Sequence, residues 1–435
     1  MYIDGGSIYM TQKMLTLLIT ILFISPIFIT STTPQSKPSE NSHLTFSHLI
    51  DQINQSLVQK YHAQLMSFGP RYTGSENCSN AGDWIYSTFS NMDLEVRFHH
   101  WDYAGFSSRN IVATLPGTQQ NSSIEYLLTA HYDCTPNSLG ADDDGSGIAA
   151  ILSIAQVLQH TSFPYTLRFI AFSGEEVGTY GSYSYARDAY ENQDNIRAVI
   201  NPDMIGYADT ADGGKTLRFF YPERSKWIAT YAQKIANKYD TIIDMTIDGL
   251  PNYVGSDHQP FVDYGYDGVW VAHQDGYQWA NTPEDNPEHL NFTYLTKATK
   301  TLLAVIAELV SEPVPLSIQL IQPYEGYFYI NNNPLLRLDF GKQWYLGLRG
   351  KTIMLGSPKA KAIVEHTDQI KYVVFCVDNN FLFWDSKPPY EWNIQGKHIP
   401  IFGKHTIQAY AYTTTDHMSM DEMDIIGFST QYQYG

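Results

Sequence analysis

The middle of the chain alternates between short, continuous apolar runs and stretches in which apolar residues recur with helical spacing. Four apolar runs have the length of buried strands, at residues 124–130, 166–172, 196–200 and 268–272. Stretches of helical character lie between them, at residues 146–160, from about residue 179, and at 227–239. Strands that alternate with helices in this way predict an α/β fold with a mixed, mostly parallel sheet sandwiched by helices.

Helical spacing also precedes and follows this region. It predicts helices at residues 43–66, 81–92 and 295–309. Residues 109–115 are predicted to form a strand, which Pro116-Gly117 ends. Together these segments predict one α/β domain over residues 43–312.

After Pro313 and Pro315 the pattern changes to short alternating strands rich in aromatic and β-branched residues. This texture predicts a small all-β sandwich over residues 313–435. A total of 435 residues suits two hydrophobic cores better than one.

The first 42 residues are interpreted as a signal peptide or anchor with a linker. An apolar run at residues 15–29 follows Lys13 and contains Pro26. It is short for a membrane span of about 20 residues, so a secretory signal is favoured, with an uncleaved membrane anchor as the alternative. We therefore expect a secreted or cell-surface protein. Four glycosylation sequons are compatible with export: Asn54, Asn77, Asn121 and Asn291.

Charge and cysteine content narrow the function further. The chain has 27 Lys and Arg against 45 Asp and Glu, a net charge of −18. This balance disfavours binding to nucleic acid or to anionic membranes, which requires basic patches. Only three cysteines are present, which excludes a disulfide scaffold and a zinc finger, although Cys78 and Cys134 could pair.

Acidic residues and one histidine follow the predicted strands, at the point where each strand ends. His131 and Asp133 follow the first run, a cluster at residues 142–144 lies in the next loop, Glu175 and Glu176 follow the second run, and Asp203 follows the third. In an open α/β sheet, ligands bind outside the carboxyl ends of the strands. We therefore expect these side chains to converge.

Each motif has a chemical use. In His131-Tyr132-Asp133, residues two apart point to one side, so Asp133 can orient the imidazole while its other nitrogen faces a metal. Three adjacent carboxylates between glycines repel one another unless a cation is present. Of the adjacent Glu175 and Glu176, one can bind a metal while the other acts on water as general base. Each motif alone is commonly a surface feature, but their order along successive strands indicates a metal site.

These segments resemble the M28 family of metallopeptidases over roughly residues 45–310. The resemblance is carried by the motifs Gly-Pro-Arg-Tyr-Thr-Gly-Ser (69–75), Asn-Ile-Val-Ala-Thr-Leu-Pro-Gly (110–117), the His131 and Asp133 pair, the Gly/Asp loop at 140–147, Phe-Ser-Gly-Glu-Glu (172–176) and Asn-Pro-Asp-Met-Ile-Gly (201–206). It implies that Asp143 bridges two zinc ions, with a cis peptide bond to Asp144. It further implies that His131 and Asp203 complete one Zn²⁺ site, that Glu176 serves the other, and that Glu175 is the base.

One position departs from the family pattern. Asn281 stands where the resemblance implies a histidine ligand of the second zinc, in Asn-Thr-Pro-Glu-Asp. An amide oxygen is a poorer zinc ligand than imidazole, so the second metal binds weakly, is a harder ion, or recruits another group. His273 is a candidate substitute, although a packed histidine is the favoured interpretation. His258, in a loop that also resembles the family, is assigned a possible substrate contact.

The resulting prediction is a zinc metallopeptidase, an aminopeptidase that removes N-terminal residues from peptides. A binding or receptor-like protein that lost catalysis is the alternative, and Asn281 supports it. A glutaminyl cyclase, which uses a single zinc on this fold, ranks third because it relies on the histidine replaced here. The C-terminal sandwich resembles Ig-like modules of extracellular enzymes, through residues 385, 388–392 and 403–406; attachment or stability is its expected role.

Overall fold

The computed structural model describes most of the chain after residue 41. The described ranges are 42–120, 122–251, 255–311, 318–324, 326–338, 351–364, 370–394, 402–414 and 418–428. The predicted signal peptide and the sequon at Asn121 lie outside them. Within these ranges, no helix combines the length and apolar character needed to cross a membrane.

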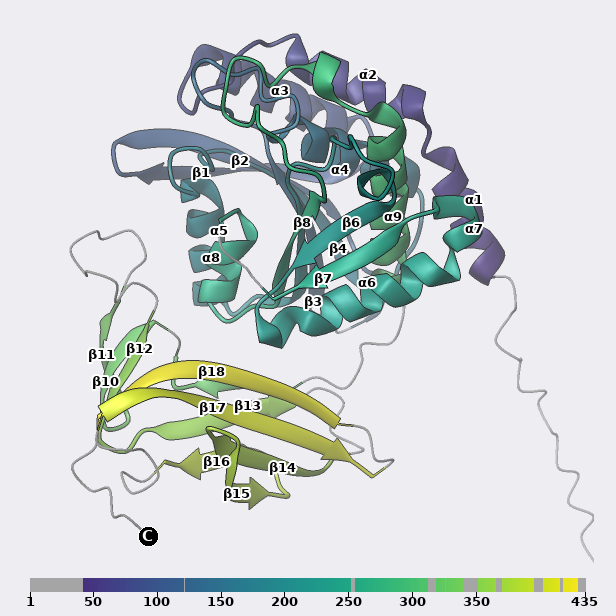
Figure 1. The fold of residues 1–435 in the computed structure, drawn as a ribbon. Coiled ribbons are helices and arrows are strands. Elements are labelled where there is room, and N and C mark those ends of the chain that lie inside the picture. The colour runs from purple at the N-terminus through teal and green to yellow at the C-terminus, as the bar shows by residue number, and fades with distance from the viewer. Residues whose placement is uncertain are drawn as a thin grey trace, which may run out of the picture. The chain divides into compact units, whose positions relative to one another are not determined.

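An eight-stranded sheet forms the centre of the first part of the chain (Figure 1), in the order β1-β2-β4-β3-β5-β8-β6-β7. Neighbours β3/β4, β3/β5, β5/β8 and β6/β7 are parallel, and the other three pairs are antiparallel. The predicted mixed, mostly parallel α/β fold is confirmed. The strands are β1 (Glu95–Tyr103), β2 (Phe106–Leu115), β3 (Ile124–His131), β4 (Thr166–Phe172), β5 (Asn195–Pro202), β6 (Thr216–Phe220), β7 (Thr246–Leu250) and β8 (Gly268–His273).

Helices cover both faces of this sheet because successive residues of the central strands point to opposite sides. In β4, Phe169 packs in one core cluster and Ile170 in the other. The larger cluster includes side chains from α1 (Ser42–Gln52), α2 (Gln55–Met66), α3 (Glu76–Ser90), α4 (Gly145–Leu158), α6 (Lys226–Lys238), α7 (Asp240–Ile243) and α9 (Phe292–Ser311). The smaller cluster includes side chains from α5 (Tyr180–Asn192) and α8 (His258–Asp263). Three 3₁₀ turns, at Gly213–Lys215, Glu223–Ser225 and Pro287–His289, lie in connecting segments.

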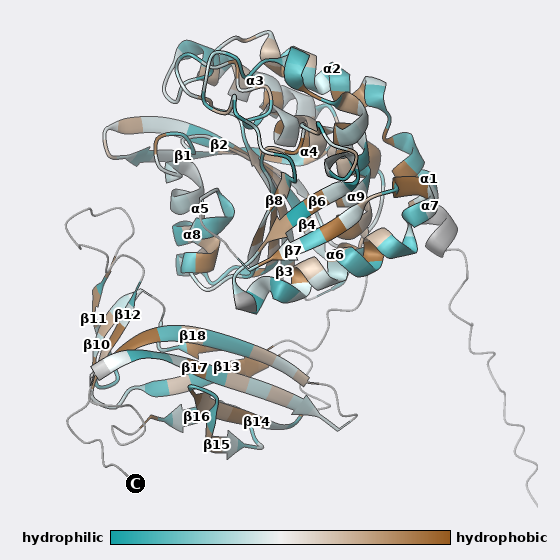
Figure 2. Cartoon of the chain, in the orientation of Figure 1, coloured by the Kyte–Doolittle hydropathy of each residue, from teal (hydrophilic) through white to brown (hydrophobic). Residues whose placement is uncertain are grey.

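The helix predicted at residues 43–66 is instead two helices. Asn54 lies between them in an extended conformation, and its side chain accepts a hydrogen bond from the amide of Leu57. This cap satisfies a free amide at the start of α2 and interrupts the helical run. Amphipathic spacing is retained in the outer helices: α6 shows both hydrophobic and hydrophilic residues along its length (Figure 2), and its buried residues include Ile228 and Ile235.

The C-terminal part contains two further sheets that share one core. A seven-stranded sheet has the order β11-β10-β12-β18-β17-β14-β15, and a three-stranded sheet has the order β16-β13-β9. Side chains from both, such as Leu320, Phe375 and Trp392, pack in one cluster. The strands are β9 (Ile318–Gln322), β10 (Tyr327–Ile330), β11 (Asn333–Arg337), β12 (Thr352–Leu355), β13 (Lys359–Val364), β14 (Ile370–Val377), β15 (Asn380–Asp385), β16 (Tyr390–Asn393), β17 (Phe402–Thr413) and β18 (Met418–Phe428).

An all-β C-terminal region is therefore confirmed. Its Ig-like character and the boundary at residue 312 stay predictions.

Candidate metal centre

His131, Asp143 and Asp203 meet at the carboxyl edge of the eight-stranded sheet. One potential ligand atom from each lies within 4.8 Å of the other two, and all three side chains are buried. His131 Nε2 is 3.2 Å from Asp143 Oδ1 and 3.7 Å from Asp203 Oδ1. The convergence follows from topology, because β3 ends at His131, its parallel neighbour β5 ends just before Asp203, and Asp143 precedes α4.

The chemistry of this group fits a divalent cation. His131 Nε2 is buried and makes no hydrogen bond, although two carboxylates face it. Burial and the neighbouring charge of Asp203 raise the pKa of Asp143. Burial alone would lower the pKa of His131, but the carboxylates of Asp133, Asp143 and Asp203 raise it above its usual range. Imidazole nitrogen and carboxylate oxygen are ligands that zinc accepts, and a cation would relieve the repulsion.

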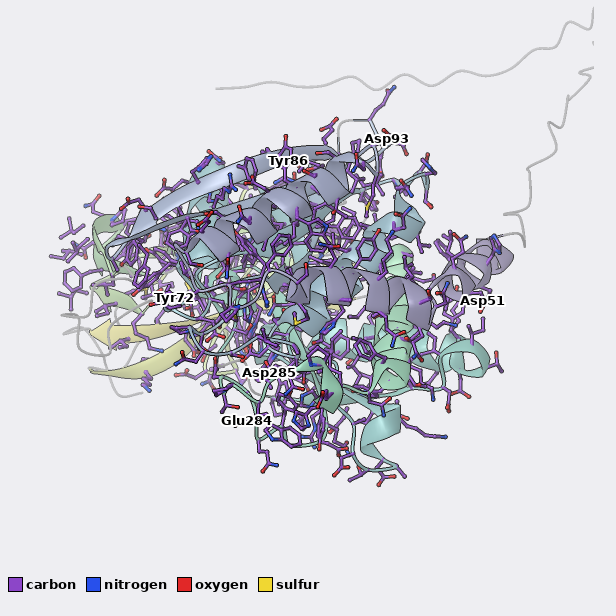
Figure 3. All side chains as sticks on the ribbon, turned by 90° about the horizontal axis from the view of Figure 1, so that it is seen from above. Asp51, Tyr72, Tyr86, Asp93, Glu284 and Asp285 are labelled. Carbon is purple, nitrogen blue, oxygen red and sulfur yellow. The ribbon has the colours of Figure 1, made fainter. Side chains whose placement is uncertain are left out.

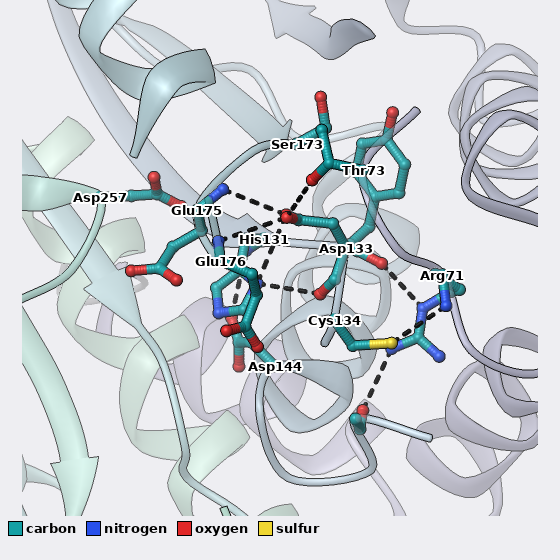
Figure 4. A network of polar contacts seen from close by, with 12 residues as sticks. Arg71, Thr73, His131, Asp133, Cys134, Asp144, Ser173, Glu175, Glu176 and Asp257 are labelled. Carbon is teal, nitrogen blue, oxygen red and sulfur yellow. Dashed lines mark hydrogen bonds and ion pairs between the residues drawn. The ribbon is translucent and has the colours of Figure 1, made fainter. Parts of the chain in front are cut away.

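Asp133 connects the histidine to the glutamate loop. His131 Nδ1 lies 3.1 Å from the backbone carbonyl of Asp133 and 3.7 Å from its carboxylate. The Nδ1–H therefore points to the carbonyl, which leaves the Nε2 lone pair facing the metal position. The Asp133 carboxylate accepts hydrogen bonds from Thr73 Oγ1 at 2.6 Å and from the amides of Glu175 and Glu176 at 3.3 Å (Figure 4). The Asp133 carboxylate thus contacts mainly the backbone of the loop after β4, and its expected role of orienting the imidazole stays a prediction.

Of the three adjacent aspartates, only Asp143 belongs to the metal group. Asp142 accepts from the amide of Gly206 and lies 3.0 Å from His273 Nε2. The favoured interpretation of His273 as a packed histidine agrees with this contact. The expectation that all three carboxylates require a cation is therefore too broad.

Asp144 builds the scaffold around the metal group. The Asp143–Asp144 peptide bond is cis, as the family resemblance implied. The Asp144 carboxylate accepts hydrogen bonds from the amides of His131, Gly147 and Met204, which connects β3, the start of α4 and the loop after β5. A Cβ at Gly147 would lie 2.5 Å from that carboxylate, so this position requires glycine.

Glu175 and Glu176 lie in the loop after β4, both partly buried. Glu176 Oε1 is buried without a hydrogen-bond partner, and burial followed by the charge of Asp143 raises the pKa of Glu176 to about 8. Burial also raises the pKa of Glu175, and the charge of Asp257 adds to this. Asp257, which the sequence interpretation missed, lies beside Glu175 in Figure 4 and accepts a hydrogen bond from Ser182 Oγ at 2.5 Å. Only its place in the Ser-Asp-His loop could have indicated it.

The remaining predicted positions lie differently. His258 is fully buried at the start of α8, and its substrate contact stays a prediction. Asn281 is exposed and has a left-handed backbone (φ 61°). The three cysteines are free thiols, so the pairing of Cys78 with Cys134 is not found. Cys134 Sγ instead accepts a hydrogen bond from the amide of Arg71.

Asp285 is a second residue whose role the sequence interpretation missed. It is buried beside the exposed Glu284 (Figure 3), and its carboxylate accepts hydrogen bonds from the amides of Asp142 and Asp143 at 2.9 and 3.2 Å. Tyr277 Oη donates to the same carboxylate at 2.7 Å. The loop between β8 and α9 is thereby anchored directly on the backbone of a metal-group residue.

Comparison with known proteins agrees with this geometry. Residues 110–306 match the model of peptidase family M28 and include every member of the metal group. This part of the chain is similar to that family. The matched residues contain most of β2 and the strands β3 to β8 with the residues at their carboxyl edge, but not β1.

Two relatives and one solved structure illustrate the match. Aminopeptidase YwaD of Bacillus subtilis is 33% identical over 222 residues, 47% of this chain and 46% of the relative, so the chain spans about half of that protein's length. Leucine aminopeptidase 1 of Phaeosphaeria nodorum is 28% identical over 306 residues, 63% of this chain and 75% of the relative. The structure of BSAP, a zinc aminopeptidase from Bacillus subtilis, is 18% identical with a TM-score of 0.53, covering 60% of this chain and 97% of that one. That likeness shows the shared fold.

Proposed function

We propose that this protein is a metal-dependent aminopeptidase, which hydrolyses the peptide bond after the N-terminal residue of a peptide. The observation that carries the proposal is the group of His131, Asp143 and Asp203 with Glu175 next to it, inside the region that matches peptidase family M28. The relatives named aminopeptidases support the reaction, and the zinc aminopeptidase from Bacillus supports zinc as the metal. When bound, the ion would polarise the scissile carbonyl and promote ionisation of water.

Side chains of the protein transfer the proton and position the base. Glu175 is the base: its carboxylate takes the proton from the attacking water and passes it to the departing amine. Asp133 is a positioning residue, because its carboxylate holds the backbone amides of Glu175 and Glu176. Burial keeps the pKa of Glu175 above its usual range, which brings its proton affinity closer to that needed at neutral pH.

The electrostatics favour a free amino terminus over an internal peptide segment. Three carboxylates lie around one site: Glu175, Glu176 and Asp257. Burial and neighbouring carboxylates raise the pKa of each. Such raised pKa values show that the ionised carboxylates repel one another, and a nearby ammonium group would relieve this repulsion. Exopeptidase activity at the N-terminus is therefore favoured over endopeptidase activity.

The test is the substitution Glu175→Gln, assayed on aminoacyl fluorogenic substrates with and without chelator. We expect turnover to fall by about 10²-fold or more, while bound metal stays at the wild-type amount. The matched control is Glu284→Gln, an exposed glutamate in the loop before α9, which should keep wild-type turnover. A fully active Glu175→Gln variant would remove this residue from the base role.

A non-catalytic binding protein is the second candidate, and the exposed Asn281 is the observation in its favour. If the protein only binds a ligand, the wild-type chain should show no chelator-sensitive hydrolysis of any aminoacyl substrate.

An extracellular location is part of the proposal and rests on the apolar run at residues 15–29. Mass determination of chain recovered from the medium would show whether that run is removed.

A further inference from the structure

We propose that this metal centre holds one tightly bound ion per chain, on His131, Asp143 and Asp203, and that the second ion position beside Glu176 is incomplete. This inference rests on the proposed function for the nature of the centre, but it concerns the number of ions rather than the reaction. A second ion, where present, is held by oxygen atoms alone and exchanges freely. The residue responsible is Asn281.

The first position is complete in the protein alone. It combines one imidazole nitrogen with two carboxylates, whose ligand atoms lie within 4.8 Å of one another. Two of these ligands are also oriented by hydrogen bonds on the side away from the metal position. His131 Nδ1 faces the Asp133 carbonyl, and Asp203 Oδ2 accepts a hydrogen bond from Ser256 Oγ at 2.5 Å. Such outer contacts strengthen metal binding.

The second position is not complete. Glu176 Oε1 is buried and has no hydrogen-bond partner, so one ligand oxygen is available there, and the family resemblance implies that Asp143 is shared between the two positions. In the described part of the chain, however, the only group of three or more metal-ligating side chains is the one that contains His131. Two carboxylates without imidazole or thiolate make a poor zinc site.

The loop that should supply the missing ligand is in place. Asp285 anchors it to the amides of Asp142 and Asp143, and Asn281 lies four residues before this anchor. The Asn281 side chain is exposed, and its left-handed backbone conformation is one that Asn and His both tolerate. The chain therefore retains the support for a second ligand but carries a neutral amide there.

Three histidines near this loop each make another contact, and none of them belongs to a group of metal-ligating side chains in the described part of the chain. His62 Nε2 bonds the backbone carbonyl of Ala141 at 2.8 Å. His273 Nε2 faces Asp142 at 3.0 Å, and the ring of His289 stacks on Trp279 with centroids 3.8 Å apart. The choice between one and two tightly held ions thus depends on position 281.

The experiment counts zinc in the purified full chain by elemental analysis, after saturation with zinc and exhaustive dialysis against metal-free buffer. We expect one zinc per chain for the wild type and two for Asn281→His. Gln278→His is the matched control: it adds a histidine at another exposed position of the same loop and should leave the count at one. Glu176→Gln in the Asn281→His background should return the count to one.

Cobalt(II) titration gives an independent measurement. The visible absorption of the cobalt-loaded protein should saturate at one equivalent in the wild type and at two in Asn281→His. A wild type that retains two zinc ions, or an Asn281→His variant that retains one, would overturn the inference. Because position 281 is exposed, the variant is expected to fold. An unchanged melting temperature of the metal-free protein checks this, since bound zinc would itself raise that temperature.

Failure of this inference can be told apart from failure of the proposed function. A wild type that holds one zinc but hydrolyses no aminoacyl substrate refutes the aminopeptidase and supports the stoichiometry. A wild type that is active and holds two zinc ions supports the aminopeptidase and refutes the stoichiometry.

Discussion

Ser256 Oγ donates a hydrogen bond of 2.5 Å to Asp203 Oδ2. The other carboxylate oxygen of Asp203 is thereby left facing His131 Nε2, at 3.7 Å. Ser256 is itself held by Asn201, whose Nδ2 donates to its hydroxyl at 2.8 Å, and Thr129 donates to Asn201 Oδ1 at 2.6 Å. A buried chain of hydrogen bonds from β3 through the end of β5 thus orients a metal-group carboxylate.

Removing this contact should weaken metal binding without removing a ligand. For Ser256→Ala we expect the dissociation constant for zinc to rise about 10- to 100-fold, the usual cost of losing an outer contact to a ligand. Competition with a chelator of known affinity measures it. Ser90→Ala, at the exposed end of α3, is the control and should bind zinc as the wild type does. Equal affinity in the two variants would show that Ser256 does not orient Asp203.

The Asp285 carboxylate should stabilise the metal loop. In Asp285→Asn, one oxygen becomes an amide donor that faces a backbone N–H or the Tyr277 hydroxyl, so a buried hydrogen bond is lost. We expect the free energy of unfolding to fall by about 1–3 kcal/mol, measured by urea titration. Glu284→Gln, at the exposed neighbouring position, should unfold as the wild type does. No difference between these two variants would contradict the anchoring role.

His62 should make stability depend on pH. Burial lowers the pKa of His62 to about 4, against 6.5 for the free side chain. Between these values the unfolded chain binds a proton that the native chain does not, so this contribution is complete above pH 6.5 and is lost as the pH falls toward 4. The difference between the two pKa values corresponds to about 3 kcal/mol at most.

The measurement is urea unfolding at pH 7 and pH 5 for the wild type and for His62→Gln. The wild type should lose more stability than the variant between these values, because glutamine does not titrate. His48→Gln, at an exposed position of α1, should behave as the wild type. Parallel losses in His62→Gln and the wild type would mean that His62 is not buried in its neutral form.

Local patterns were sufficient to predict the central strands and the layers that cover them. Runs such as residues 124–130 and 166–172 are apolar because both of their faces are buried, and that requirement is visible in the sequence. The strands β1, β6 and β7 were not predicted. They lie toward the edges of the sheet, where polar residues occupy one face and the periodic signal is weaker.

By itself, the sequence determined which residues end each buried strand, and so which ones could meet: His131, Asp143 and Asp203. Only the tertiary structure decided the partner of each carboxylate. Asp142, Asp143 and Asp144 are adjacent and chemically alike, yet they face a histidine, the metal position and three backbone amides respectively. The physical reason is that a carboxylate bonds whichever donor the fold brings within about 3 Å. One of these donors, Gly147, is three residues away, but His131, Met204 and His273 are 13, 60 and 131 residues away in the chain.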